Sequence, residues 1–192
     1  INMMHLDEKS IREVIPAMMK KFGYKNRLAV PKIKQVVINC GFGKLVTSES
    51  KSEQKKIREH ILKDMALITG QKPALRKARK SIAGFKLREG NFIGAKVTLR
   101  KRRMYDFLER LIYIAFPRSR DFRGLDPNSV DKAGNLTIGV KEHTIFPEIS
   151  VEKEKAIFGM SITVVTSANS REEGLELLRL VGFPLKVENK KI

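Results

Sequence analysis

Apolar residues recur at helical spacing in four parts of the chain, which predicts four helices. Their expected positions are residues 10–22, 53–68, 104–115 and the segment from Ser170 to Gly182. Pro16 lies inside the first pattern, so we expect a kink or a restart of that helix. Ser50 or Ser52 can cap the second helix together with Glu53, and Pro117 is expected to end the third.

Apolar and polar residues alternate in other segments, as they do in half-buried strands. The expected strands cover residues 33–40, 74–78, 92–102, 136–141 and 161–167. Because helices and strands do not alternate strictly along the chain, the pattern favours an α+β fold with a mostly antiparallel sheet. We expect irregular structure at 41–53 and 143–160, and a frayed tail near 186–192.

The alternation gives the predicted sheet two unlike faces. An antiparallel sheet can be covered by helices on one face and left open on the other. The covered face would hold Val36, Ile38, Val97, Leu99, Ile138, Val140, Ile162 and Val164. The open face would present Gln35, Asn39, Lys96, Thr98, Arg100, Thr137, Lys141 and Thr163. We therefore expect a single domain, residues 1–192, with one face of its sheet available to a ligand.

Charge changes this picture more than length does. The 192 residues are 42% hydrophobic, which is enough for one core, but the formal net charge is +18. The segment from Lys72 to Arg103 holds twelve Lys or Arg and one acid, around a predicted basic hairpin extension near 74–95. Such a concentration favours a polyanionic partner, either nucleic acid or an anionic membrane. We find no run of 18 apolar residues and expect no membrane span.

Side chains suited to RNA accompany this charge. Lys and Arg at such density can neutralise several phosphates. Phe85 and Phe92 either stack on unpaired bases or pack within the protein. The glycines that would let the backbone approach a ligand closely are Gly84, Gly90 and Gly94. A second cluster consists of Arg118, Arg120, Arg123 and the intervening Phe122. A plain solvated charged loop is the alternative interpretation of the whole basic run.

The sequence shows no group of residues with the spacing that catalysis or metal binding would require. The single cysteine, Cys40, excludes an intrachain disulfide framework and a cysteine zinc cluster, and its alternation with apolar residues predicts inert core. "GFGK" at 41–44 lacks the first glycine and the Ser or Thr of a phosphate loop, so it predicts a tight turn, with backbone contact to a phosphate left open. We expect neither an enzyme nor a cofactor.

The histidines do not change that expectation. They show no metal-ligand spacing and stand at His5, His60 and His143. His60 is expected on a helix surface. Glu142 adjoins His143, but neighbours on a strand point to opposite faces, so an acid–base pair is not expected.

From "KARKSIAGFKLREGNFIGAKVTLRKRRMYDFLERLI" onward the chain resembles the bacterial-type large-subunit ribosomal protein five, the 5S rRNA-binding family of the central protuberance. The resemblance continues through "FPRSRDFRGL", "GNLTIGVKEHTIFPEI" and "GMSITVVTSANSREEGLELLRLVGFP". It begins near "VIPAMMKKFGYKN" and "VPKIKQVVINCGFG", and so covers roughly residues 10 to 184. The chain departs from the usual pattern at "CGFGKL" and at "RKRRMYDFL", where it is more basic.

The resemblance implies a structural role in the large subunit, where the partners are 5S rRNA, large-subunit rRNA, the P-site tRNA, neighbouring proteins of the central protuberance and a small-subunit head protein. The implied 5S rRNA contacts are Gln35, Asn39, Gly41, Gly43, Lys44, Lys96, Thr98 and Arg100. The implied tRNA-facing loop holds Arg76, Lys77, Arg79, Lys80, Ser81, Phe85, Lys86 and Arg88. Other rRNA or bridge contacts would come from Arg118, Arg120 and Arg123.

Two other functions remain as hypotheses. An RNA-processing or chaperone factor would carry the same basic sheet, and a phosphate-handling enzyme would rest on "GFGK" alone. The expected location is the ribosome. It would be cytoplasmic in a bacterium, while a mitochondrial or plastid matrix stays open because the chain begins at Ile1 and a targeting peptide can precede it.

Overall fold

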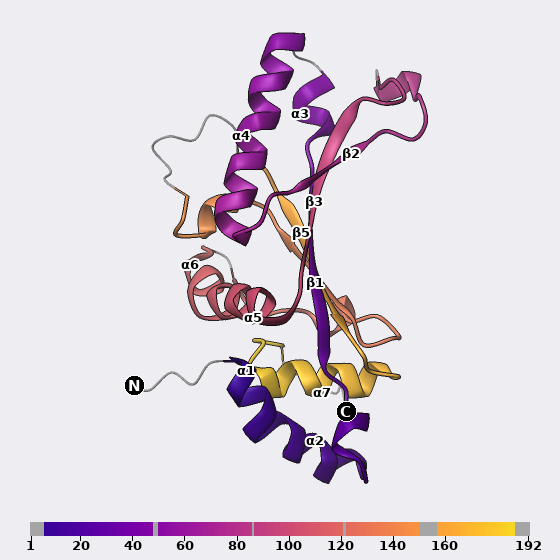
Figure 1. Ribbon diagram of the computed structural model, residues 1–192, viewed down its shortest axis with the longest axis vertical. Helices are drawn as coiled ribbons and strands as arrows, with labels where there is room; N and C mark the ends of the chain where they lie inside the picture. Colours follow the sequence, from indigo (N-terminus) through magenta and orange to yellow (C-terminus); the bar gives the residue numbers. More distant parts are fainter. Residues whose placement is uncertain (1–5, 48–49, 86, 121, 150–156, 187–192) are drawn as a thin grey trace. The chain divides into compact units, whose positions relative to one another are not determined.

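Five strands pair into one sheet in the computed structural model of the chain (Figure 1). Its order is β2-β3-β1-β5-β4. The strands are β1 Ile33–Gly41, β2 Ala74–Lys77, β3 Phe92–Leu99, β4 Leu136–Val140 and β5 Met160–Thr166. The described residues are 6–47, 50–85, 87–120, 122–149 and 157–186. The α+β class with an antiparallel sheet is confirmed. The predicted third strand was too long, since β3 ends at Leu99 and a helix begins at Lys101.

Helices occupy the predicted segments with shifted ends. The α-helices are α1 Leu6–Lys9, α2 Ile15–Phe22, α3 Gly43–Thr47, α4 Lys51–Thr69, α5 Lys101–Arg110, α6 Phe116–Arg118 and α7 Arg171–Val181. π turns at Ser10–Val14 and Leu111–Ala115 join α1 to α2 and α5 to α6. Short 3-10 turns lie at Arg27–Ala29, Ala83–Phe85, Pro127–Ser129 and His143–Ile145. The described part of the chain holds no helix with the length and hydropathy that a bilayer crossing requires.

Contacts divide the chain into two compact units. The first contains residues 1–36, 99–138 and 163–192, and the second contains residues 37–98 and 139–162.

The first unit contains the predicted N-terminal helix, in which α1, the π turn and α2 follow one another without a gap and Val14 keeps right-handed helical angles. Pro16 stands in the first turn of α2, directly after the π turn, which is a common place for the helical hydrogen-bond pattern to change around a proline. α2 ends at Gly23, whose φ of 71° is left-handed. The wider π turn takes Ile11 off the apolar stripe and leaves it 49% exposed.

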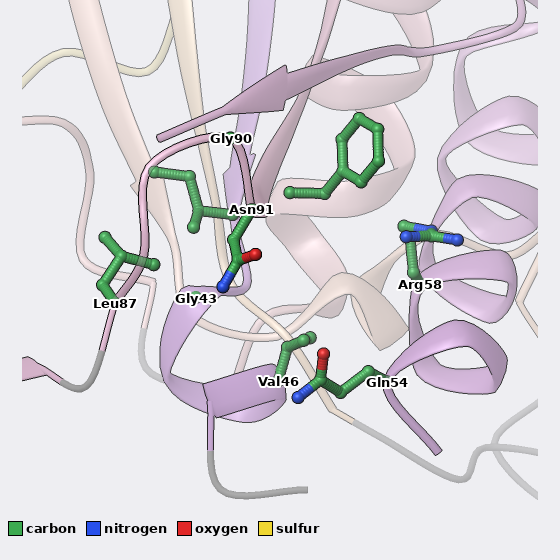
Figure 2. A pocket seen from close by; sticks show the side chains of 9 residues that line it. Gly43, Val46, Gln54, Arg58, Leu87, Gly90 and Asn91 are labelled. Atoms are coloured by element: carbon green, nitrogen blue, oxygen red, sulfur yellow. The ribbon is translucent and has the colours of Figure 1, made fainter. Parts of the chain in front are cut away.

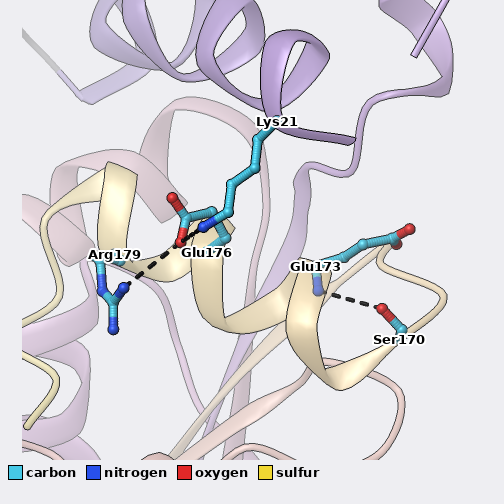
Figure 3. Close-up of polar contacts among 5 residues, drawn as sticks. All are labelled: Lys21, Ser170, Glu173, Glu176 and Arg179. Carbon is cyan, nitrogen blue, oxygen red and sulfur yellow. Dashed lines mark hydrogen bonds and ion pairs between the residues drawn. The ribbon is translucent and has the colours of Figure 1, made fainter. Parts of the chain in front are cut away.

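α7 is tied to α2 in the same unit (Figure 3). Lys21 Nζ lies 2.7 Å from Glu176 Oε2. Ser170 caps α7 by accepting a hydrogen bond from the Glu173 backbone N–H at 3.2 Å. The Glu173 carboxylate accepts from the Asn169 N–H at 2.9 Å, so the cap extends one residue further than a reciprocal Ser170–Glu173 box would.

The third predicted helix is the best defined from its pattern. All of its stripe residues are buried: Met104, Phe107, Leu108, Leu111, Ile112 and Ala115. Pro117 does not end it directly, because it stands in the first turn of α6, and the helix continues to Arg118.

The second unit is organised by α4, whose N-terminus is fixed by side chains. Ser50 and Glu53 form the reciprocal capping box, which decides between the two serines that the sequence left open. Ile61, Met65 and Ile68 are buried, and Gly70 ends α4 with a φ of 64°. The predicted irregular segment at 41–53 was wrong in part, because it contains α3 and the start of α4.

Burial confirms the strand faces. Each of the eight residues assigned to the covered face is buried, with at most 8% of its surface exposed. The eight assigned to the opposite face are all exposed or half-buried. Period-two alternation therefore places the polar residues of β1, β3, β4 and β5 on one side of their strands.

A glycine pair in the first unit generates a stability prediction. Gly174 of α7 packs on the backbone of Gly134, and a Cβ at Gly174 would stand 2.6 Å from the Gly134 carbonyl oxygen. Gly134 is itself closely surrounded, since a Cβ there would stand 2.8 Å from Ala168 Cβ and 3.1 Å from the Ser170 carbonyl oxygen. Gly174→Ala should lower the free energy of unfolding by roughly 1–3 kcal/mol, because overpacking exceeds the gain of about 1 kcal/mol in helix propensity. Urea unfolding followed by circular dichroism measures this.

The matched control is Gly139→Ala on β4, where a Cβ would meet nothing within 4 Å. That variant should stay within about 0.5 kcal/mol of the parent or gain slightly. A Gly174→Ala protein as stable as the control would show that the contact with Gly134 is not tight.

Candidate nucleic-acid interface

The basic hairpin extension exists and is regular at its base. β2 pairs with β3 in antiparallel register, with Ala74 opposite Lys96 and Arg76 opposite Gly94. The register shifts after Arg76, so that Lys77 stands opposite Phe92. Bulges of this kind bend and twist a strand. Beyond it, Ala78 N–H donates to the Asn91 carbonyl oxygen at 2.8 Å, which continues the two arms past the sheet.

The tip of the hairpin is closed by its two apolar residues. Ile82 and Leu87 form an antiparallel bridge, with hydrogen bonds of 3.0 and 3.1 Å between their backbones. Ser81 Oγ accepts from the Glu89 N–H at 2.9 Å. The turn between them presents Phe85, which is 66% exposed. Ile82 and Leu87 therefore order the tip, and the Phe85 ring faces solvent at its end.

Most cations of the hairpin point to solvent. The exposed ones are Arg76, Lys77, Arg79, Lys80 and Arg88, while Lys86 lies outside the described residues. Phe92 behaves differently from Phe85. The Arg58 guanidinium lies 5.0 Å and the Lys77 ammonium 5.4 Å from the centroid of the Phe92 ring. Phe92 is thus engaged by cations of the protein itself, and the packing alternative holds for it.

Gly94 does not approach a ligand. A Cβ there would stand 2.9 Å from the Cys40 carbonyl oxygen, so this buried glycine permits close packing of β3 on β1. Gly90 has a φ of +83° and turns the hairpin arm. Gly84 lies open at the tip, where an added Cβ would meet nothing within 4 Å. The expectation of three ligand-facing glycines was therefore wrong for Gly94.

A shallow pocket of about 230 Å³ opens at the base of the hairpin in the second unit. Gln54 and Arg58 of α4 face it from one side, and Asn91 of the hairpin arm faces it from another (Figure 2). Its remaining lining comes from Gly43, Val46, Leu87, Gly90, Phe92 and Ile93. The sequence did not reveal Gln54 and Arg58, because a helix pattern does not show which exposed face meets a distant hairpin.

The predicted contacts of the β1–α3 corner adjoin this pocket. Gly41 ends β1, Phe42 is fully buried, and Gly43 opens α3 instead of a tight turn. Lys44 is exposed on α3 and Asn39 is exposed on β1. The corner thus combines an anchored aromatic ring with an exposed cation and an exposed amide.

On β3, Lys96 and Thr98 are half-buried on the polar face. In the first unit, Arg100 Nη2 donates to Gln35 Oε1 at 2.6 Å. Thr137 and Thr163 lie within hydrogen-bonding distance, 3.2 Å, on β4 and β5. Cross-strand side-chain pairs of this type order a sheet surface.

In the second basic cluster the three arginines are exposed, whereas the aromatic residue packs within the protein. Arg118, Arg120 and Arg123 are exposed. Phe122 stacks on the buried Phe116 with centroids 4.6 Å apart, so its ring packs within the first unit.

His60 and His143 both lie beside Asp64, a grouping that the sequence analysis did not predict. His60 is half-buried, not a plain surface residue, and its Nε2 lies 3.2 Å from Asp64 Oδ2. His143 is fully buried, with Nε2 3.8 Å from the same oxygen and Nδ1 accepting from the Phe158 N–H at 3.4 Å. The i, i+4 spacing of His60 and Asp64 was the available signal. No cluster of metal-ligating side chains occurs among the described residues.

Cys40 is inert core, as predicted. It is fully buried, and desolvation raises the pKa of its thiol to about 12. The reactive thiolate is therefore not formed at neutral pH.

Two family models match this sequence. One, described as ribosomal protein L5, matches residues 26–88, and the other, the C-terminus of the same ribosomal family, matches residues 92–185. The large ribosomal subunit protein uL5 of Dictyoglomus turgidum is 54% identical over 181 residues, covering 94% of this chain and 98% of that protein. The uL5 of Clostridium botulinum is 50% identical over 182 residues, covering 95% and 98%.

Proposed function

Because the chain belongs to the ribosomal protein L5 family, we propose that it fixes 5S rRNA in the central protuberance of the large subunit. Membership makes it a structural constituent of the large ribosomal subunit and not an enzyme. The observation that carries the proposal is the polar, cationic side of the strands, whose opposite side is buried apolar core. Phosphate and 2′-hydroxyl groups are recognised by such hydrogen-bonding surfaces.

The proposed 5S rRNA contacts divide between the two units. In the second unit they are Asn39, Gly41, Gly43, Lys44, Lys96 and Thr98. In the first they are Gln35 and Arg100, whose mutual hydrogen bond holds the guanidinium in a fixed orientation. An ordered guanidinium loses less side-chain entropy when it meets a phosphate. Arg58 and Gln54 join this surface from α4, since they face the pocket beside Gly43.

The hairpin tip is proposed to meet the P-site tRNA. Two observations support this proposal: the cations around the tip are exposed, and the Ile82–Leu87 bridge closes the tip. An ordered tip presents charge at a defined position, and the exposed Phe85 ring can stack on a base or ribose. The residues assigned here are Arg76, Lys77, Arg79, Lys80, Ser81, Phe85, Lys86 and Arg88.

Remaining contacts are assigned to the second basic cluster. Arg118, Arg120 and Arg123 would meet large-subunit rRNA, a neighbouring ribosomal protein or the small-subunit head. The relatives come from bacteria, which supports a bacterial ribosome, in the cytoplasm, over an organellar one. A general RNA chaperone with the same basic surfaces is the competing function, and RNA selectivity separates the two.

The first prediction concerns selectivity and salt. The protein should bind isolated 5S rRNA, and six or more phosphate contacts would weaken binding roughly a thousandfold between 50 and 200 mM salt. Filter binding over a salt series measures both quantities. The control is an unrelated structured RNA of equal length. Equal affinity for the two RNAs would remove the 5S assignment and favour the chaperone.

The second prediction separates the hairpin from the 5S surface. Changing Arg76, Lys77, Arg79 and Lys80 to Ala should leave free 5S rRNA binding within about threefold. It should weaken P-site tRNA binding to reconstituted ribosomes at least about tenfold, the effect of losing one charge-assisted hydrogen bond. The matched control changes four exposed cations elsewhere to Ala: Lys20, Lys25, Lys56 and Lys132. Loss of 5S rRNA binding by the hairpin variant alone would show that the two surfaces are not separate.

A further inference from the structure

A second hollow, of about 410 Å³, lies in the first unit between the start of β1 and the start of α5. Its lining residues are Lys32, Ile33, Lys34, Lys101, Arg102, Met104 and Tyr105. Ile33 and Met104 are buried and Tyr105 is half-buried, so these three give the hollow an apolar and aromatic floor. The four cationic residues are exposed and form its rim.

The positive charge of this rim is largely unneutralised. Within the described ranges, no ion pair or side-chain hydrogen bond engages Lys34, Lys101 or Arg102. The hydrogen bonds of Lys32 are made by its backbone, to Ser167. The nearest acid along α5 is Asp106, one turn beyond Arg102 and exposed. Four cations around one hollow repel one another, and an anionic ligand relieves that repulsion.

Lys101 holds an uncommon backbone conformation at this rim. Its φ is 53°, and it is the non-glycine residue with positive φ among those described. The left-handed region disfavours side chains, and a glycine would occupy it without strain. Lys101 therefore places a cation at the mouth of the hollow, at a backbone position where a glycine would cause less strain.

We infer that this hollow binds the phosphodiester backbone of RNA, as a contact separate from the sheet face and the hairpin. Arg102 can pair with a phosphate through two N–H groups, while the three lysines act as point charges. The apolar floor and the Tyr105 ring suit the ribose face between two phosphates better than they suit an acidic peptide, whose carboxylates need donors throughout. The choice of RNA as the polyanion rests on the proposed function.

The test compares two double variants that remove equal charge. The hollow variant, Lys101→Gly with Arg102→Gln, removes two cations from the rim. The control variant, Lys25→Gln with Lys132→Gln, removes two cations from exposed sites outside the hollow. Filter binding uses purified bacterial 5S rRNA and large-subunit rRNA, each separately, over a salt series. The hollow variant should bind one of the two RNAs about a hundredfold more weakly, with the slope of log affinity against log salt reduced by roughly 1.4 to 1.8.

The control variant should stay within about threefold of the parent, and Lys101→Arg with Arg102→Lys should restore most of the affinity because it keeps the charge. Lys34→Glu, on an exposed strand position, provides a second variant that leaves Lys101 untouched and should weaken binding at least about tenfold. Thermal melting is expected to stay unchanged or rise in the glycine variant.

Parent-like binding of both RNAs by the hollow variant and by Lys34→Glu would overturn the inference. If these variants kept RNA binding but lost binding to an acidic protein, the inference would be overturned as well. Failure of the parent protein to bind either RNA would instead contradict the proposed function, so the two failures are distinguishable.

Discussion

Burial of one side of the sheet is the constraint on which the rest of the protein depends. Because side chains alternate along a strand, burying Val36, Ile38, Val97 and Leu99 commits the intervening residues to the opposite side. A one-residue slip would bury Lys96 and Arg100, so the register is strongly specified. The core thus decides where Asn39, Thr98 and Arg100 stand, and hydrophobic burial indirectly builds the polar surface proposed for RNA.

Charge then separates this protein from other small α+β folds. Unbalanced cations destabilise the free protein through mutual repulsion, and binding to phosphate relieves it. Within the protein, part of the charge is ordered by neutral partners. Gln35 accepts from Arg100, and the Phe92 ring lies near Arg58 and Lys77. These contacts orient cations without cancelling their charge, which suits surfaces that must still attract RNA.

Sequence periodicity predicted the features that depend on residues close together in the chain. The features that it missed depend mostly on contacts between residues far apart in the chain. The stripe from Met104 to Ala115 and the strand faces follow from spacing alone, whereas the choice of Ser50 over Ser52 as the cap needed the structure. The α5 start at Lys101 was missed because a left-handed lysine has no sequence signal. Asp64 lies near His143, and Arg58 lies near Phe92, across sequence separations that periodicity does not encode. The polar side of the strands was predicted from the sequence, whereas Gln54 and Arg58, the α4 residues that face the pocket, were not.

The most direct test of the central claim is the identity of the RNA that the native protein holds. The protein would be cross-linked in its own cells, purified under denaturing conditions, and its attached RNA sequenced and compared with total cellular RNA. The account predicts that 5S rRNA and a limited region of large-subunit rRNA are enriched well above their abundance. Messenger and transfer RNAs recovered in proportion to their abundance, with no enrichment of 5S rRNA, would contradict it.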